Sequence, residues 1–220
     1  MKNVIYFILV SLIVFTSCKK DSNPISPRED ASTVTYSGKV YHTVKIGNQT
    51  WLKENLDVGV MIDSLQNPSN NGTIEKYCYD NDTANCNKYG GLYQWNEAMA
   101  YDTANGARGI CPTGWHIPNN SEFDSFAAFV NNNGNALKSL GQGTGSGAGT
   151  NTSGFSALLG GYRYDNRTFF YLGDATNFWS STENNASFAY HIGLWDDASG
   201  IFMDYRYKVY GFSIRCIKDE

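Results

Sequence analysis

The amino-acid sequence predicts an α+β domain in which two short helices pack on irregular, mostly antiparallel short strands. Its 220 residues are 41% hydrophobic and 15% aromatic, which is enough for a packed core and is unlike a disordered chain. The 22 glycines and the charged fraction of only 17% are typical of turn-rich β structure. Helical periodicity occurs between about residues 92 and 130, whereas short apolar runs separated by turn residues fill the chain beyond residue 150.

The charge of the chain argues against one class of partner. The sequence has 17 Lys and Arg against 21 Asp and Glu, which gives a net charge of −4. A protein that binds nucleic acid needs a basic face to neutralise the phosphates. We therefore expect no nucleic-acid partner.

The first residues have the pattern of a secretory signal peptide. A basic start at Lys2 precedes an apolar run over 4–15, which is shorter than the roughly 20 residues that span a bilayer. Small residues and then Cys18 follow, a pattern that resembles the bacterial lipobox, in which the cysteine becomes lipidated. The alternative is an ordinary signal peptide with an incidental cysteine. We expect export and anchoring to a bacterial outer membrane, facing the surface or the periplasm, with the lipid as the only membrane contact.

This interpretation divides the chain into three parts. Residues 1–17 are the lipoprotein signal peptide, and residues 18–32, which are polar and contain proline, are a flexible tether. Residues 33–220 remain as one domain, a length that supports a sizeable core.

The domain contains an even number of cysteines. In an exported chain this favours two disulfides, and four cysteines allow three pairings. No Cys-x-x-Cys motif occurs and the histidines lie far apart, so we expect no metal site. The cysteines are Cys78, Cys86, Cys111 and Cys216, and the histidines are His42, His116 and His191.

The first elements expected in chain order are a hairpin and a loop. Residues 41–46 and 50–52 flank Gly47-Asn48, which is typical of a β-hairpin with a tight turn. Residues 57–90 carry Asn, Asp, Gly and Pro with little periodicity, so we expect mostly loop there.

Two short helices are expected next. Leu92, Trp95 and Met99 fall at i, i+3 and i+7, which predicts a short amphipathic helix. The second helix is better marked, because Asn119 can cap its start and Glu122 can complete a capping box. Its core-facing stripe consists of Phe123, Phe126, Ala127 and Val130, and the run Asn131-Asn132-Asn133-Gly134 ends it.

The second half of the chain predicts a glycine-rich loop and then a series of strands. Residues 141–149 resemble a phosphate-binding loop but lack the Gly-Lys-Ser/Thr ending, so we expect a flexible surface loop. Short strands between Gly, Asn and Asp turns are expected at 155–159, 162–164, 169–171, 178–180, 189–195, 201–205 and 212–217.

Six segments, taken together in their order and spacing, resemble one family. They are VKIGNQTW (44–51), YGGLYQW (89–95), CPTGWHIP (111–118), GFSAL (154–158), FWSSTE (178–183) and GFSIRC (211–216). Over roughly residues 40–218 the chain resembles the Fibrobacter succinogenes major paralogous domain family, which is found in exported and lipid-anchored bacterial proteins.

That family is similar to the C-type-lectin-like fold shared by the formylglycine-generating enzymes, so the resemblance implies a C-type-lectin-like domain. In such folds the positions of Cys111 and Cys216 suit a structural bridge. The seven residues between Cys78 and Cys86 let that pair close a small loop. We therefore predict the disulfides Cys78–Cys86 and Cys111–Cys216.

Composition and resemblance together favour a binding module. Loops rich in Tyr, Gly, Ser and Asn combine rigid aromatic area with adaptable hydrogen bonding, as in antibody paratopes. We expect an extracellular glycan or protein ligand and a role in adhesion. The alternative is a structural subunit of a surface assembly. An oxidase related to the formylglycine-generating enzymes is not expected, because no reactive cysteine pair remains if all four cysteines form disulfides.

The predicted ligand-facing surface lies at the end of the strand over 189–195. Alternation along this strand places Trp195 on the less apolar face, which we expect to be nearer the solvent. The alternative is that the Trp195 side chain packs under the next turn. A tryptophan beside two acids suits a sugar, because the sugar ring can stack on the indole and the carboxylates can accept hydrogen bonds from the sugar hydroxyls. The predicted ligand-binding residues are Trp195, Asp196, Asp197, Tyr205 and Tyr207, and we expect no catalytic residue.

Two further expectations concern charged groups. No cofactor is expected, with calcium held by the acids of 80–82 or 196–197 as the alternative, because lectin-like folds often bind this ion. Arg215 alternates with inward-facing residues of the last strand, so we expect a structural role in which its guanidinium binds a carboxylate or backbone carbonyls. Glu183 is the preferred partner.

Overall fold

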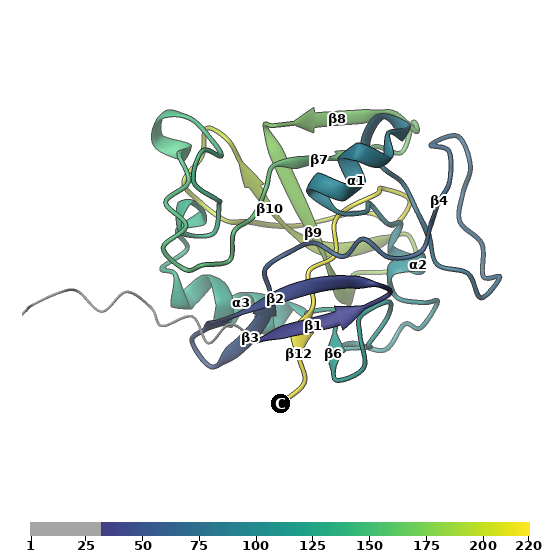
Figure 1. Ribbon diagram of the computed structural model, residues 1–220, viewed down its shortest axis with the longest axis horizontal. Helices are drawn as coiled ribbons and strands as arrows, with labels where there is room; N and C mark the ends of the chain where they lie inside the picture. Colours follow the sequence, from purple (N-terminus) through teal and green to yellow (C-terminus); the bar gives the residue numbers. More distant parts are fainter. Residues whose placement is uncertain (1–31) are drawn as a thin grey trace, which may run out of the picture.

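The computed structural model describes residues 32–220, which form two five-stranded sheets and a separate two-stranded pair (Figure 1). The first sheet has the order β1 (Thr33–Tyr36), β2 (Lys39–Ile46), β3 (Gln49–Leu52), β12 (Ile217–Lys218), β6 (Trp115–His116). The second has the order β11 (Phe202–Tyr207), β10 (Phe188–Trp195), β9 (Ala175–Glu183), β7 (Gly160–Arg163), β8 (Phe169–Leu172). The small pair joins β4 (Val60–Met61) to β5 (Glu75–Lys76).

Helices occupy little of the described chain. The α-helices are α1 (Thr83–Tyr89), α2 (Trp95–Ala98) and α3 (Asn120–Phe129), and 3-10 turns lie at Tyr79–Asn81, Gly134–Ala136 and Gly145–Gly147. Strand pairing is antiparallel except for β4 with β5 and the single pair between β7 and β9. The predicted α+β class with short, mostly antiparallel strands is therefore confirmed.

The better-marked helix forms as predicted. The Asn119 side chain accepts a hydrogen bond from the Glu122 backbone N–H at 3.1 Å, and the Glu122 carboxylate accepts one from the Asn119 N–H at 2.8 Å. These two bonds satisfy N–H groups that a helix start leaves without partners. Asn131 and Asn132 then adopt left-handed backbone angles, with φ of 53° and 54°, which stop the helix.

The prediction that 57–90 is mostly loop missed α1. This helix has seven residues and buries only Cys86, so it lacks the apolar period by which a helix is recognised. Its start is fixed instead by Asp82, whose side chain accepts a hydrogen bond from the Ala84 N–H at 2.9 Å. The other expected helix, α2, is shorter than its pattern suggested, because Leu92 lies outside it in a β-bridge.

The predicted hairpin is confirmed and is preceded by a second one. Across Gly47-Asn48, Ile46 pairs with Gln49, and Gly47 has a φ of 62° at the first central turn position. The strand β1 was not predicted. It joins β2 through Ser37-Gly38, a two-residue turn in which both residues have positive φ.

Aromatic side chains build the core in two clusters. In the first, Trp51 of β3 lies 4.6 Å from Phe126 of α3, measured between ring centroids, so the helix packs against the first sheet. In the second, Trp179 of β9 lies 4.4 Å from Phe212 and donates its indole N–H to the Tyr93 carbonyl at 2.8 Å. The C-terminal segment that carries Phe212 therefore packs against the second sheet.

Two of the expected strands are only partly formed. Residues 155–159 contribute one bridge, at Ala157, because Ser156 has a left-handed φ of 59° that interrupts an extended run. Residues 212–217 cross from one sheet to the other, since Ser213 bridges Phe178 and Ile217 pairs with Trp51. In Figure 1 this yellow segment runs from the second sheet down to β12.

The glycine-rich segment 141–149 packs against the turn that follows β10. The Thr144 N–H donates to the Asp196 carbonyl at 2.8 Å. A Cβ on Gly147 would lie 2.6 Å from the Ala198 nitrogen and closer still to the Asp196 carbonyl, so no side chain fits there. The glycines thus permit close backbone packing, and this loop, which lies at the surface as expected, is held against the turn after β10.

His116 of β6 ties the last residues to α3. Its Nδ1 lies 2.6 Å from a carboxylate oxygen of Asp219, and its Nε2 lies 2.8 Å from one of Glu122. Burial alone would lower the pKa of His116, but the hydrogen bonds to these two carboxylates outweigh it and raise the pKa.

The predicted signal peptide, residues 1–17, and nearly all of the predicted tether lie outside the described residues, as does Cys18. Among residues 32–220, no helix has the length and apolar character needed to cross a membrane.

Candidate functional site

A pocket of about 220 Å³ lies between the β9–β11 face of the second sheet and the C-terminal segment. We call it the His191 pocket. The residues that give it its chemical character are His191, Trp195, Asn177, Tyr162, Asp204 and Arg206.

The strand register brings these side chains together. In one cross-strand row His191 of β10 pairs with Trp179 of β9 and Asp204 of β11. In the next row on the same face, Gly193 pairs with Asn177 and with Phe202. Side chains of directly paired residues point to the same face of a sheet, so the polar groups of three strands meet here.

His191 is the most unusual group in the pocket. The residue is only 6% exposed, yet neither ring nitrogen has a hydrogen-bond partner. Its ring lies 4.9 Å from Phe212 and 6.2 Å from Trp179. Burial, aided by the nearby positive charge of Arg206, lowers the pKa of His191 to about 4. The imidazole is therefore neutral at pH 7 and offers one donor and one acceptor.

Gly193 keeps the space beside His191 open. A Cβ at this position would lie 2.8 Å from the Asn177 side-chain oxygen and 3.9 Å from His191 Cε1. Any larger residue in this part of β10 would therefore push Asn177 aside and fill the pocket.

Aromatic rings form the wall next to these polar groups. Trp195 is half-buried, and its ring meets that of Tyr171 edge-on at a centroid distance of 5.2 Å. Tyr171 in turn stacks on Tyr162 at 5.5 Å, and Tyr162 lies parallel to Tyr210 at 6.4 Å. The Trp195 ring is held in place by these contacts, while part of its surface stays accessible.

The charged groups of the pocket balance one another. Arg206 and Asp204 form an ion pair on β11, each about half exposed. Because His191 is neutral, the lining groups carry no net charge. The pocket can thus offer hydrogen-bond donors and acceptors without favouring an ion.

The structure divides the predicted ligand-binding residues. Trp195 lines the pocket on the face that alternation indicated, but Asp196 and Asp197 do not line it. Both acids lie in the turn against the glycine-rich segment, where the Asp197 carbonyl accepts from the Ser146 hydroxyl at 3.0 Å. Their charges also act on buried Lys138, whose pKa is lowered by burial because the two carboxylates offset only part of that effect.

Tyr205 and Tyr207 also lie outside the pocket. Tyr205 stands between Asp204 and Arg206, so it points to the opposite face, where its ring contacts Phe188 at 5.6 Å. The Tyr207 ring packs on Phe188 as well, at 4.2 Å.

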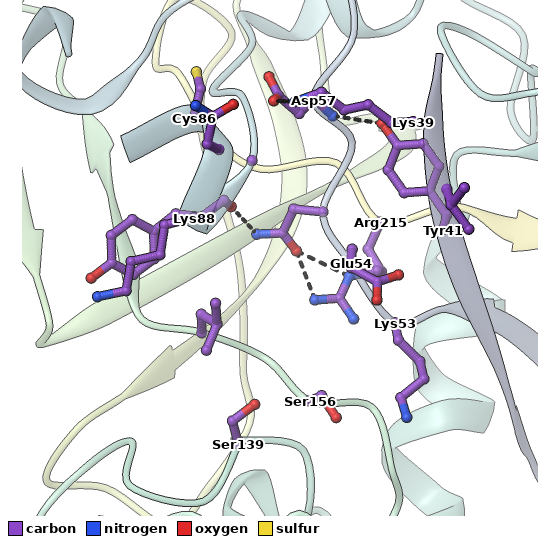
Figure 2. A pocket seen from close by; sticks show the side chains of 16 residues that line it. Lys39, Tyr41, Lys53, Glu54, Asp57, Cys86, Lys88, Ser139, Ser156 and Arg215 are labelled. Carbon is purple, nitrogen blue, oxygen red and sulfur yellow. Dashed lines mark hydrogen bonds and ion pairs between the residues drawn. The ribbon is translucent and has the colours of Figure 1, made fainter. Parts of the chain in front are cut away.

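Arg215 has the expected structural role but not the expected partner. Its guanidinium donates to the Asn55 side-chain oxygen at 2.7 and 3.0 Å (Figure 2). It also donates to the carbonyls of Leu52 and Phe155 at 3.1 and 2.7 Å. The prediction of Glu183 as its partner is wrong, because the carboxylate of Glu183, the last residue of β9, pairs with Lys208.

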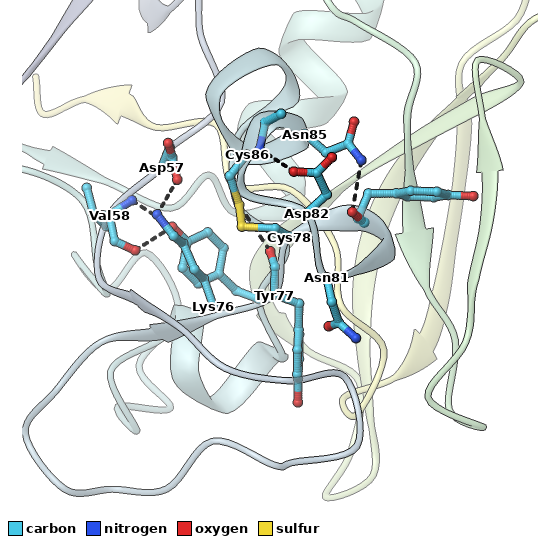
Figure 3. Close-up of a disulfide and its surroundings, with 12 residues drawn as sticks. Asp57, Val58, Lys76, Tyr77, Cys78, Asn81, Asp82, Asn85 and Cys86 are labelled. Carbon is cyan, nitrogen blue, oxygen red and sulfur yellow. Dashed lines mark hydrogen bonds and ion pairs between the residues drawn. A yellow bond between two sulfur atoms is a disulfide. The ribbon is translucent and has the colours of Figure 1, made fainter.

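The disulfide Cys78–Cys86 forms as predicted. It links α1 to the strand-like segment before it, beside Tyr77 and Asp82 (Figure 3). Since α1 has little apolar surface of its own, this bond and the Asp82 cap hold the helix in place.

The second predicted disulfide, Cys111–Cys216, also forms. It connects the segment before β6 with the C-terminal segment, near the core cluster that contains Trp179. The C-terminal segment that covers the His191 pocket is therefore anchored covalently.

Sequence reasoning singled out Trp195 but treated His191 as an ordinary histidine. The available signal was the alternation that put His191, Gly193 and Trp195 on one face of the strand. In residues 32–220 no group of three or more His, Cys, Asp or Glu is placed to hold a metal ion.

The fold and the pocket define an α+β domain with a small, aromatic candidate binding site that carries no net charge. A family model for the Fibrobacter succinogenes major domain matches residues 44–218, so the chain belongs to this family. No curated protein and no solved structure matches the chain.

Proposed function

We propose that the protein is an exported, lipid-anchored binding module whose His191 pocket receives one neutral sugar ring of a glycan. One observation carries this proposal: a buried histidine whose two ring nitrogens have no partner lines a pocket together with the half-buried Trp195.

The hydrogen-bonding capacity of His191 supports a hydroxyl ligand. A buried polar group without a partner costs about 1–3 kcal/mol. A neutral imidazole has one donor and one acceptor, and a sugar hydroxyl is both. Each ring nitrogen of His191 has less than 1 Å² of accessible surface, so a hydroxyl can pair with either tautomer once a neighbouring side chain of the pocket moves aside. The Asp204–Arg206 pair supplies further donors and acceptors at the same pocket.

Shape and charge support a single neutral ring. A volume of about 220 Å³ lies below the roughly 300–1,000 Å³ of pockets for drug-sized molecules. The half-buried Trp195 lines the pocket and offers an aromatic surface on which a sugar ring can stack. The balanced charges of the lining favour a neutral ligand over an ionic one.

We further propose that the domain has a C-type-lectin-like fold. The family membership and the six sequence segments support this, as do the capped helix α3 and a disulfide that ties Cys111 to the C-terminal segment. Glycan binding by loops and strand ends would be compatible with such a scaffold.

Glycan-array binding of the purified protein tests the proposal, with Trp195→Ala as the pocket variant and Tyr205→Ala as the matched control. Tyr205 is an exposed aromatic residue on the other face of β11. We expect array signals that are lost in Trp195→Ala, kept in Tyr205→Ala and unaffected by EDTA. A Trp195→Ala variant that folds normally and keeps every signal would disprove the site, and loss of signal in EDTA would point to calcium instead.

The exposed edge strand β11 favours a second candidate, a structural subunit of a surface assembly. This strand lies at the edge of its sheet and exposes several large apolar side chains: Phe202, Met203, Tyr205 and Tyr207. Exposed apolar edge strands are templates for pairing with another chain. Concentration-dependent association in sedimentation experiments, abolished by Tyr205→Lys, would support assembly, and a monomer at all concentrations would reject it.

A further inference from the structure

One part of the His191 pocket is a space with a glycine as its floor and side chains around it. Gly193 of β10 pairs with Asn177 of β9 on one side and with Phe202 of β11 on the other. Along β10, His191 and Trp195 lie two residues before and after Gly193. Paired residues and residues two apart on a strand share a face, and all five line the pocket. We call this space the Gly193 cell.

The glycine is explained by the space and not by backbone conformation. Gly193 has no positive φ, so the strand would accept another residue there. A Cβ would have the Asn177 side-chain oxygen at 2.8 Å as its nearest neighbour, and the next two atoms at 3.8 and 3.9 Å. A glycine inside a strand often marks a place where a ligand comes close to the backbone.

The polar wall of the cell is an amide without a partner. Asn177 is only 5% exposed. Its backbone carbonyl accepts from the Ser213 N–H at 3.0 Å, but within residues 32–220 its side chain makes no hydrogen bond. A primary amide has two N–H donors and one carbonyl acceptor. A buried site of this kind favours a ligand that pairs with it over an analogue that leaves it unpaired.

The wall opposite this amide is apolar. Phe202 is 47% exposed, so part of its ring is free to contact a ligand. An acetamido group is divided in the same way, because it has an N–H, a C=O and a methyl. A hydroxyl has no apolar part and would use the polar wall alone. An amide facing a phenyl ring across a bare glycine therefore fits an acetamido group better than a hydroxyl.

We infer that the Gly193 cell receives the acetamido group of an N-acetylated amino sugar, which makes such sugars the preferred ligand class of the His191 pocket. This inference rests on the proposed function. The acetamido N–H or C=O pairs with the Asn177 amide, and the methyl packs on Phe202. The sugar ring stacks on Trp195, and a neighbouring hydroxyl is left for His191.

NMR titration of the purified protein tests this inference. The probes are N-acetylglucosamine and N-acetylgalactosamine, and the controls are glucose and galactose, which lack the acetamido group. We expect at least one N-acetylated sugar to bind with a Kd about tenfold or more below that of its parent sugar. Its binding should also shift the side-chain NH2 signals of Asn177.

Two variants examine the cell itself. Gly193→Ala fills the space, and the atom that its Cβ meets is the end of a side chain that can turn away, so the fold should be kept. Asn177→Ala leaves the space open and removes the amide. Both should reduce the preference for the N-acetylated sugar to about threefold or less. Gly200→Ala is the matched control and should leave it unchanged, because its Cβ would have no atom within 4 Å.

The outcomes separate this inference from the proposed function. Array signals confined to glycans without acetamido groups, or equal binding of N-acetylated and parent sugars, would overturn the inference and leave the proposed function standing. A blank array would overturn both. A preference that survives both variants would overturn the Gly193 cell. Binding of Nε-acetyl-lysine as tight as that of the amino sugars would overturn the assignment to a sugar.

Discussion

Replacing Gly147 with alanine should destabilise the protein by crowding the backbone of Asp196 and Ala198. The residue lies in the glycine-rich segment that packs against the turn after β10, and its φ lies outside the left-handed region. An added Cβ would lie 2.6 Å from the Ala198 nitrogen, whereas non-bonded heavy atoms prefer about 3.5 Å or more. The cost is therefore one of space and not of backbone conformation.

The size of the effect follows from this overlap. Overpacking in a well-packed region costs about 1–3 kcal/mol. The two groups that the added Cβ meets, the Asp196 carbonyl and the Ala198 nitrogen, belong to the backbone and cannot rotate away. We therefore expect a loss of unfolding free energy of about 3 kcal/mol. For a domain of this size each kcal/mol lowers Tm by about 2–4 °C, which gives a decrease of about 6–12 °C. Thermal unfolding followed by circular dichroism measures it.

Gly200→Ala is the matched control. This glycine lies a few residues beyond the same turn, has no atom within 4 Å of an added Cβ and also lacks a left-handed φ. Its Tm should stay near that of the wild type. If Gly147→Ala melted within about 1 °C of Gly200→Ala, the glycine-rich segment would not be packed as described, and our explanation of its composition would be wrong.

Three other predictions concern cysteines and a histidine. Replacing both Cys111 and Cys216 with serine should lower the unfolding free energy by several kcal/mol in urea titrations, up to the roughly 4.7 kcal/mol that chain entropy gives for a loop of about 100 residues. Because the pKa of His116 is raised above its usual 6.5, its stabilising charge is complete below that value and is lost as pH rises through the folded pKa. His116→Gln should consequently cost more stability at pH 5.5 than at pH 8.5, and equal costs would contradict the assignment. Cys18→Ser should release the protein from the membrane fraction, whereas full retention would reject the lipid anchor.

Local signals in the sequence were sufficient for several elements. The capping box at Asn119 and the turn at Gly47-Asn48 act within a few residues, so their structures follow from neighbouring side chains. The helix α1 was missed because a cap and a disulfide hold it, and not an apolar stripe. The packing of the glycine-rich segment was not predicted, because its partner lies about 50 residues further along the chain.

The same distinction applies to the candidate site. Alternation along one strand placed Trp195 and His191 on one face correctly, since that rule is local. Tyr205 was assigned to the site by nearness in the sequence, although the alternation of β11 turns it away. The partner of Arg215 required knowledge of how Asn55 approaches it from 160 residues away, which no local pattern contains.

The central claim is that His191 binds a sugar hydroxyl, and NMR of the imidazole nitrogens tests it most directly. The chain has only three histidines, so His42 and His116 serve as internal references. Titration with the glycan selected on the array should shift the His191 nitrogen signals strongly, fix one tautomer and leave the other two histidines unchanged. A glycan that binds with measurable heat while the His191 signals stay as in the free protein would contradict the account.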